Sequence, residues 1–255
     1  MTPFEAFSLK GRAIAVTGAS SGIGRCVAVR ASQMGARLLL LGRDEERLKE
    51  TLSSLEGEGH KSVLLDFRDT NSLDTRLGDI LDGFGSLNGA VHSAGISELT
   101  LLRDADLDEA EAMMRVNWLS FTALAKAVCR RGRYAKGMSI VALASISATA
   151  GQTGLSVYAA SKGTIIAAVR SLASEYAPRG IRFNCVSPAP VDTPMQRQTR
   201  ERLGDEWYKK EVLDKAKLGT LVPEDVTDPI LFLLSDASRR VTGTNMIIDG
   251  GWSLS

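Results

Sequence analysis

The chain has 255 residues, of which 44% are hydrophobic and 24% are charged, and its formal net charge is +1. This composition is typical of a globular protein with a sizeable core, and the balanced charge gives no argument for nucleic acid or an anionic membrane as a partner. No apolar run approaches the roughly 20 residues that span a bilayer, and residues 1–10, with Glu5 before any basic residue and no apolar stretch, do not predict a secretory signal. Three scattered cysteines predict neither disulfides nor a metal site, so we expect a cytoplasmic protein without a bound metal.

A glycine-rich turn follows the first predicted strand. Residues 12–16 form a short apolar run that is typical of a strand buried on both faces, and an apolar-periodic segment after the turn predicts a helix. Between them lies Thr-Gly-Ala-Ser-Ser-Gly-Ile-Gly, residues 17–24. In this context Gly18 permits the tight turn, Gly22 the approach of a pyrophosphate and Gly24 close packing of helix on strand. The amides at the start of the helix then offer a site for an anion.

The end of the second predicted strand, residues 38–41, is where a dinucleotide-binding fold reads the ribose. No carboxylate stands at that end, and Arg43 follows it, with a guanidinium suited to a 2′-phosphate. Asp44 can read a ribose hydroxyl, but it also precedes a predicted helix over 45–55, which it would serve as N-cap. We therefore favour NADP(H) over NAD(H), with a solvated surface charge as the alternative role for Arg43.

The third predicted strand, residues 61–65, ends at Asp66 and Phe67. At the carboxyl end of a strand these two residues can hold an adenine ring. A structural cap is an equally good interpretation of Asp66. A helix is predicted from about residue 72 to residue 81.

A fourth strand over 87–92 leads to one long predicted helix over 107–131. Asn117 lies in the middle of that helix, where asparagine is unfavourable. On the residues alone, most such asparagines face water. The basic residues between 126 and 136 are a solvated helix end or a surface that receives an acidic carrier.

The fifth strand, residues 138–143, runs towards Ser145, and a glycine-containing turn then leads to a helix that carries Tyr158 and Lys162. Four residues apart, these two side chains project from the same helical face. A tyrosine with a pKa of about 10 is a poor acid or base near neutrality, whereas a nearby ammonium favours the phenolate and lowers that pKa. The pair thus makes an acid–base group. Alone, the spacing also fits a half-buried tyrosine beside a solvated lysine.

The last elements are a sixth strand over 181–186, a helix over 223–234 and a seventh strand over 245–248. The segment at about 190–218 is rich in proline and charge and is predicted to be a mobile substrate lid. Seven strands that alternate with helices predict an α/β fold with a doubly wound parallel sheet, the Rossmann fold, in a single domain that takes in the whole chain.

With these residues in place, the chain resembles the short-chain dehydrogenase/reductase family in its compact single-domain branch, over residues 10–251, and its general pattern is similar to the β-ketoacyl carrier-protein reductases. The motifs that carry the resemblance are Thr17-Gly-x-x-x-Gly-x-Gly24, Ala94-Gly95, Asn117, Ser145, Tyr158-x-x-x-Lys162 and Ser187-Pro-x-Pro-Val-Asp-Thr193. The resemblance implies that Tyr158 exchanges a proton with the substrate oxygen. Lys162 would lower the pKa of Tyr158 and bind the nicotinamide ribose. Ser145 would hydrogen-bond the carbonyl, and Asn117 would join a water relay rather than face solvent.

The resemblance also implies which residues bind the nucleotide. Val191 and Thr193 would meet the nicotinamide carboxamide. The expected cofactor-binding residues are Gly18, Ser20, Ser21, Gly22, Ile23, Gly24, Arg43, Asp66, Phe67, Ala94, Gly95, Pro188, Val191 and Thr193.

Two departures from the family pattern stand out. His92-Ser93 replaces the usual Asn-Asn before Ala-Gly, so the hydrogen bonds of the central strand must be made in another way. Ala189 replaces the glycine that usually follows Pro188, and alanine has less backbone freedom, which bears on the geometry of the cofactor loop. We expect His92 to be a core or near-cofactor residue rather than a catalyst.

The expected function is hydride transfer between a nicotinamide and a small-molecule carbonyl or secondary alcohol, carried out by a homodimer or homotetramer. Two alternatives remain open: an NAD(H)-dependent alcohol or sugar dehydrogenase of the same family, and a nucleotide-binding sensor or interaction subunit without turnover. The fold does not determine the substrate. The lid, including Trp207 and Tyr208, is expected to decide it.

Overall fold

The computed structural model describes residues 4–70 and 72–254. Within these residues, seven parallel strands form one sheet in the order β3-β2-β1-β4-β5-β6-β7. The strands are β1 (Ala13–Thr17), β2 (Arg37–Gly42), β3 (Lys61–Leu64), β4 (Leu87–His92), β5 (Tyr134–Leu143), β6 (Arg182–Pro188) and β7 (Asn245–Ile248). From β1 the chain adds strands towards one edge of the sheet, up to β3, and from β4 it adds them towards the other edge, up to β7. This change of side between β1 and β4 confirms the predicted doubly wound fold.

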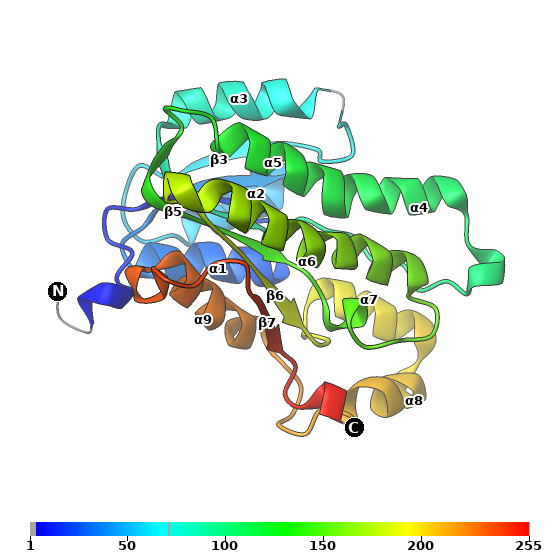
Figure 1. The fold of residues 1–255 in the computed structure, drawn as a ribbon. Coiled ribbons are helices and arrows are strands. Elements are labelled where there is room, and N and C mark those ends of the chain that lie inside the picture. The colour runs from blue at the N-terminus through cyan, green and yellow to red at the C-terminus, as the bar shows by residue number, and fades with distance from the viewer. Residues whose placement is uncertain (1–3, 71, 255) are drawn as a thin grey trace.

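Helices cover both faces of the sheet (Figure 1). One face packs on α3, α5 and α6, and the other on α1, α2 and α9. The helices are α1 (Gly22–Gln33), α2 (Glu45–Ser53), α3 (Leu73–Phe84), α4 (Leu107–Met114), α5 (Ser120–Val128), α6 (Ser156–Tyr176), α7 (Pro194–Leu203), α8 (Asp205–Tyr208) and α9 (Pro223–Leu234).

The apolar runs seen in the sequence become strands because each strand buries both of its faces. In β1, Ala13 and Ala15 join one core cluster, while Ile14 and Val16 join the other on the opposite face. Successive side chains of a strand point to opposite faces, so a strand in the middle of two layers needs no polar alternation.

The fifth strand is longer than its apolar run. It begins at Tyr134 rather than at the predicted residue 138, and Tyr134 pairs with Leu87. The register between β4 and β5 shifts after that pair, and Gly137 has a φ of +80°. The added residues are only partly buried and carry no apolar signal.

The predicted helix over 107–131 is interrupted. Helix α4 passes into a π-helical turn, Arg115–Leu119, and α5 then ends at Val128. The Ser120 hydroxyl donates to the carbonyl of Val116 at 2.5 Å, within this stretch. A π turn adds a residue to the helical repeat and often marks a functional site. Asn117 lies in it.

The expected lid contains regular structure. Thr193 caps α7 by accepting a hydrogen bond from the amide of Gln196, and Pro194 stands at the first helical position. Helix α8 and a second π turn, Lys209–Leu213, follow. None of the residues of α7 is buried, which explains why the sequence carries no apolar period there. The mobility of the segment stays a prediction.

In the part of the chain that the structure describes, no helix is both long and apolar enough to cross a membrane. Nor do these residues bring together three or more His, Cys, Asp or Glu side chains in a geometry for a metal ion. Cys26, Cys129 and Cys185 are free thiols.

Candidate active site

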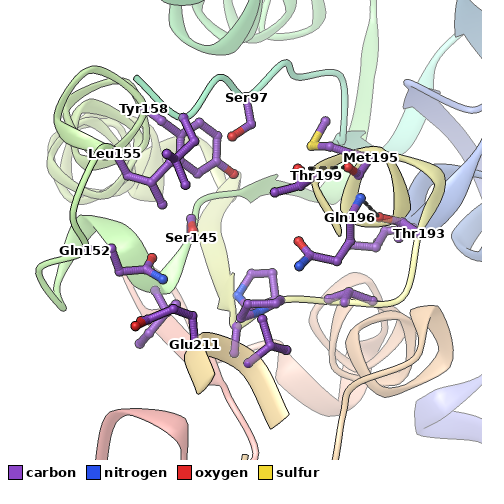
Figure 2. Close-up of a pocket in the computed structure, with 18 of the residues that line it drawn as sticks. Ser97, Ser145, Gln152, Leu155, Tyr158, Thr193, Met195, Gln196, Thr199 and Glu211 are labelled. Atoms are coloured by element: carbon purple, nitrogen blue, oxygen red, sulfur yellow. Dashed lines mark hydrogen bonds between the residues drawn. The ribbon is translucent and has the colours of Figure 1, made fainter. Parts of the chain in front are cut away.

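Two adjoining cavities open at the carboxyl ends of the central strands. A groove of about 410 Å³ runs from Arg43 and Asp66 to Lys162. A smaller cavity of about 150 Å³ lies between β5, α6 and α7 (Figure 2). Tyr158 lines both, so any group bound in the groove can meet a molecule in the smaller cavity beside this side chain. Ligands of open α/β sheets bind at this kind of place.

The glycine-rich turn shapes the start of the groove. Gly18 has a φ of +66°, and a Cβ there would lie 2.8 Å from the amide nitrogen of Ala94. A Cβ on Gly24 would lie 2.3 Å from the carbonyl oxygen of Gly18. The hydroxyl of Thr17 accepts hydrogen bonds from the amides of Ser93 and Ala94, both at 3.1 Å. The predicted tight turn at Gly18 and the close packing at Gly24 are confirmed.

The far end of the groove carries exposed arginines. Asp44 caps α2 through the amide of Arg47 at 3.0 Å and also pairs with the Arg47 guanidinium, which confirms the N-cap interpretation. Arg43 is exposed, lines the groove and forms no ion pair with any residue of the described ranges. Its guanidinium is therefore available to an anion.

Asp66 and Phe67 form the neighbouring edge of the groove. The carboxylate of Asp66 accepts a hydrogen bond from the amide of Arg68 at 2.9 Å, so it acts as a local cap. Phe67 is buried against the core. Both residues remain within reach of a ligand in the groove.

Most of the predicted cofactor residues come together. Those that line the groove are Gly18, Ser20, Ser21, Gly22, Ile23, Arg43, Asp66, Phe67, Ala94, Gly95, Pro188 and Thr193. Val191 lines the smaller cavity instead, and Gly24 packs beneath the turn.

The predicted acid–base residues meet where the two cavities join. Ser145 follows β5 and its hydroxyl oxygen accepts hydrogen bonds from the amide of Ser147 at 3.2 Å and from its hydroxyl at 2.8 Å. The hydroxyls of Ser145 and Tyr158 face the same part of the cavity (Figure 2). A hydrogen bond with Ser145 favours the ionised form of Tyr158.

The pKa of Tyr158 nevertheless lies above its usual value, because burial of the hydroxyl outweighs the hydrogen bond with Ser145. The ammonium of Lys162 lies 5.8 Å from the centroid of the Tyr158 ring and donates to the carbonyl of Leu143 at 2.8 Å. The prediction that Lys162 lowers the Tyr158 pKa is therefore wrong for this arrangement. Burial also lowers the pKa of Lys162 to about 8.

Asn117 is fully buried, so the solvent-facing interpretation is wrong. Its side-chain oxygen accepts from the amide of Ile96 at 2.8 Å, and its nitrogen donates to the Ile96 carbonyl and to the Ser161 hydroxyl, both at 2.9 Å. A Cβ on Gly95 would lie 3.2 Å from the Asn117 oxygen and 3.4 Å from the Lys162 nitrogen. Asn117 thus ties the loop after β4 to α6 beside the acid–base residues.

His92 is a buried residue at the end of β4. Its Nε2 lies 2.7 Å from the Ser120 hydroxyl, whose own hydrogen goes to Val116, so Nε2 is the donor. Its Nδ1 has no hydrogen-bond partner among the described residues. Burial, followed by the charge of Lys162, lowers the His92 pKa to about 3, so the ring is neutral. The expected core role is confirmed, and one ring nitrogen is left unsatisfied.

Ala189 fits the loop after β6 without strain. Its amide donates to the carbonyl of Ile248 at 3.0 Å, and no residue other than glycine in the described ranges has a positive φ. The position therefore needs none of the freedom that a glycine brings.

Some residues of the site gave little signal in the sequence. Ser147 supports Ser145, and Ser161 supports Asn117; both stand in motif stretches but their partners are set by the fold. Gln152, Gln196 and Glu211 line the smaller cavity without any motif. Of the two lid aromatics, Trp207 lines this cavity, whereas Tyr208 is buried beside it.

The basic cluster lies away from these cavities. It runs from the last turn of α5 to the first residues of β5, whereas Ser145 follows the opposite end of that strand. Arg133 is held by both carboxylate oxygens of Asp82 at 2.7 Å, and Lys126 pairs with Asp74. At least part of the cluster therefore has a structural role.

Comparisons with known proteins show which proteins the chain is similar to over most of its length. Residues 18–253 match the protein family described as enoyl-(acyl carrier protein) reductase. A 3-oxoacyl-(acyl-carrier-protein) reductase of Chlamydia pneumoniae is 34% identical over 246 residues, which are 96% of this chain and 98% of that protein. The D-threitol dehydrogenase of Mycolicibacterium smegmatis is 28% identical over 97% of this chain and 95% of its own length.

A solved structure from Beutenbergia cavernae, assigned as an NAD(P)-dependent gluconate 5-dehydrogenase with NADP at low occupancy, superposes with a TM-score of 0.87 and 30% identity over 98% of this chain and all of that chain. A 3-ketoacyl-(acyl-carrier-protein) reductase from Brucella melitensis, solved with NADH, has a TM-score of 0.84 and 25% identity, over 96% of this chain and all of that chain. Both likenesses extend over the sheet and over the lid.

Proposed function

Because the chain belongs to the short-chain dehydrogenase/reductase family, whose members are oxidoreductases acting on alcohol and carbonyl groups, we propose that it transfers hydride between NADP(H) and a carbonyl or secondary alcohol, with Tyr158 as acid and base. The observation that carries the proposal is the meeting of Tyr158, Ser145 and Lys162 where the long groove joins the smaller cavity. The reacting centres of nucleotide and substrate would meet at that junction.

The groove fits a dinucleotide by its lining. The amides at the start of α1 suit a pyrophosphate, and exposed Arg43 suits a 2′-phosphate at the far end. The Thr193 hydroxyl, which accepts from Gln196, keeps its hydrogen for a carboxamide oxygen. Gly95 leaves room beside Lys162 for a ribose. A nicotinamide dinucleotide bound here supplies the hydride, and the protein orients and polarises the substrate.

The raised pKa of Tyr158 keeps its phenol protonated near neutral pH, in the state needed to donate to a carbonyl oxygen. Negative charge grows on that oxygen during reduction, and the Ser145 and Tyr158 hydroxyls stand ready as donors. The buried Lys162 is cationic below a pH of about 8 and donates to the carbonyl of Leu143 beside the acid–base residues. In the oxidative direction, Tyr158 takes the proton back.

Arg43 supports NADP(H) over NAD(H) as the cofactor. We expect Arg43→Ala to weaken NADPH binding by about 10- to 100-fold, because a charge-assisted contact worth roughly 1.5–3 kcal/mol is lost, and to change NADH binding less than twofold. Fluorescence titration of both nucleotides measures the two affinities. Equal effects on NADPH and NADH would instead favour the NAD(H)-dependent alternative.

The proposed activity is tested by mixing the protein with NADPH or NADH and a panel of ketones, and by following the loss of the reduced nicotinamide. Turnover with at least one carbonyl is expected. Tight nucleotide binding without turnover on a broad panel would favour the sensor alternative and contradict the proposal.

Two further expectations accompany the proposal. Three free thiols suit a reducing compartment, as expected for a cytoplasmic enzyme. A homodimer or homotetramer is also expected, and analytical ultracentrifugation decides its size.

A further inference from the structure

His92 is a polar side chain for which the stability of the core gives no reason. It is fully buried at the end of β4, and its ring forms one hydrogen bond among the described residues, from Nε2 to the Ser120 hydroxyl at 2.7 Å. Its Nδ1 is left without a partner. A buried polar atom without a partner lowers stability, so an apolar side chain here should make the fold more stable. The contact with Ser120 is therefore where a function of this imidazole can lie.

The Ser120 hydroxyl connects His92 to the π turn. It donates to the carbonyl of Val116 at 2.5 Å, whereas the backbone amide of Ser120 bonds to the carbonyl of Arg115. In a regular α-helix the amide of Ser120 would bond to the Val116 carbonyl. The hydroxyl thus takes the acceptor that the amide leaves, and a serine hydroxyl bound four residues back favours a bend in a helix. Ser120 therefore stabilises the wide turn.

His92 determines the direction of that hydroxyl. Ser120 has one hydroxyl hydrogen, and the Val116 carbonyl can only accept, so the hydrogen points to the carbonyl and Nε2 is the donor to the oxygen. Burial lowers the His92 pKa to about 3, so the ring is neutral and one tautomer alone satisfies both contacts. Without the ring, the hydroxyl can turn to its other staggered positions.

One helical stretch holds both ends of the loop after β4. Ser120 accepts from His92, and Asn117 binds the amide and the carbonyl of Ile96. The residues between His92 and Ile96 line the groove. The loop is therefore fixed at its two ends against the same turn of helix, and a shift of that turn moves the loop with it.

The same turn also supports the acid–base residues. Asn117 donates to the hydroxyl of Ser161, the neighbour of Lys162 in α6. A Cβ on Gly95 would lie 3.4 Å from the Lys162 nitrogen, so the loop and the ammonium are closely packed. A displacement of the π turn thus changes distances around Tyr158, and a displacement of about 1 Å can lower a rate about 100-fold.

We propose that His92 is a positioning residue of the active site: through the Ser120 hydroxyl it holds the π turn, and with it Asn117, in the arrangement that the acid–base residues need. The effect on turnover rests on the hydride transfer proposed above, whereas the effect on the π turn does not. The proposal explains why a polar ring occupies a place in the core where stability favours an apolar one.

His92→Leu and His92→Gln form the first test. Leucine removes both ring nitrogens, whereas the amide nitrogen of glutamine reaches about as far from the backbone as Nε2 and can donate to Ser120. We expect His92→Leu to lower kcat about 10-fold, with the KM of the ketone within about twofold. Its Tm should equal or exceed that of the wild type, because an unpaired buried atom is lost. His92→Gln should bring kcat back to within about threefold of the wild type. A wild-type kcat in His92→Leu, or equal losses in both variants, would overturn the inference.

Ser120→Ala tests the route. If His92 acts through the Ser120 hydroxyl, the double variant His92→Leu/Ser120→Ala should lose kcat about 10-fold, as each single variant does, rather than about 100-fold. The control is Ser139→Ala, which removes another fully buried hydroxyl, one that donates to the Leu233 carbonyl of α9 at 2.7 Å. The control should keep the wild-type kcat. Losses that multiply in the double variant would mean that His92 does not act through Ser120.

The ring itself reports the donor. The chain has two histidines, so nitrogen NMR resolves the ring of His92 from that of His60. We expect the hydrogen of His92 on Nε2 throughout the neutral pH range. A hydrogen on Nδ1 instead would leave the Ser120 hydroxyl undirected and would contradict the proposed link.

Hydrogen exchange separates this inference from the proposed chemistry, because it needs no substrate. The amide of Ile96 bonds to the side-chain oxygen of Asn117 at 2.8 Å, and the amide of Ala13 bonds to that of Asn88 at 2.9 Å. In His92→Leu we expect exchange at Ile96 to become about 10-fold faster or more, and exchange at Ala13 to stay unchanged.

The outcomes of exchange and turnover differ for the two proposals. Faster exchange at Ile96 in His92→Leu, together with a wild type that reduces no ketone, would contradict the proposed function but support the link from His92 to the π turn. Turnover by the wild type, together with unchanged exchange at Ile96 in His92→Leu, would refute the link and leave the proposed function intact.

Discussion

The two walls of the substrate cavity are built in opposite ways. One wall is formed by the end of β5 and the start of α6, and the buried side chains of Asn117 and Lys162 support it. The wall formed by α7 has no buried residue, and its ion pairs lie in water. Side chains that must hold a reacting oxygen stand on the first wall. Those expected to select the substrate stand on the second.

This difference indicates which wall determines chemistry and stability and which wall determines substrate selectivity. Buried polar groups lower stability unless they are paired. Asn117 and Lys162 take their partners from the loop after β4, from α6 and from β5, so we expect few substitutions to be tolerated at these two positions. The exposed residues of α7 have few buried partners, so substitutions on the second wall should leave the stability of the sheet unchanged. We expect substitutions on the first wall to affect chemistry and stability, and substitutions on the second to affect selectivity.

The largest effect is expected for Tyr158→Phe, on the buried wall. Removal of the hydroxyl takes away the proton donor, so we expect kcat to fall about 10³-fold or more. The nucleotide affinity should stay within twofold, because the ring remains. Single-turnover kinetics and fluorescence titration measure the two quantities. A variant that keeps a tenth of the wild-type kcat would remove Tyr158 from the mechanism.

Asn117→Ala breaks the support of the same wall. The substitution leaves the amide and carbonyl of Ile96 without their partner, so we expect a loss of about 2–4 kcal/mol in unfolding free energy and of about 10- to 100-fold in kcat. The control is Asn88→Ala, which removes a hydrogen bond to the amide of Ala13 at the far end of the sheet. It should lower stability with kcat unchanged. The same kcat in both variants would show that Asn117 acts only on stability.

Lys162→Met tests the cost of the buried ammonium. The folded-state pKa is about 8 against an ordinary 10.5, so between these pH values the unfolded chain binds more protons than the folded one. Wild-type stability should therefore rise with pH in this window, by about 3 kcal/mol in total. In Lys162→Met that contribution is absent, and urea unfolding between pH 7 and pH 11 should give a flatter profile. Parallel profiles for the two proteins would contradict the lowered pKa.

The smallest effect is expected on the exposed wall. Arg202 of α7 pairs with Glu98 of the loop after β4 at the surface. Exposed ion pairs contribute about 0–1 kcal/mol, so Arg202→Ala should change stability by less than about 0.5 kcal/mol and the KM of the ketone by no more than about threefold. The change should shrink as salt is added. Glu98→Gln is the matched variant, and an effect tenfold or larger would mean that the pair holds the lid shut.

The sequence predicted an element or a role correctly where the local structure requires one type of residue. The apolar runs of β1 and β2 predicted strands because those strands are covered on both faces, and the positive φ of Gly18 follows from its turn. Asp44 was recognisable as a cap because Glu45 begins a helix. These needs are local, so neighbouring residues are enough to reveal them.

The rest depends on distances that the order of residues does not contain. Tyr158 and Lys162 share a helical face, but the Lys162 ammonium turns to the carbonyl of Leu143, and burial raises the Tyr158 pKa. Helix α7 was not predicted because none of its residues is buried, so its sequence has no apolar period. Gln196 belongs to no motif, and only the fold places it at the smaller cavity.

The π turn at Arg115–Leu119 makes this stretch sensitive to its exact length. Each residue of an α-helix advances the chain by about 100° around the axis. Deletion of one residue here would let the segment relax into plain α-helix, and Asn117 would swing away from Ile96 while the apolar face of α5 kept its place on the sheet. In an alignment, we therefore expect a relative with a one-residue gap at this point to lack the contacts of Asn117 with Ile96 and Ser161, even if every other motif is retained.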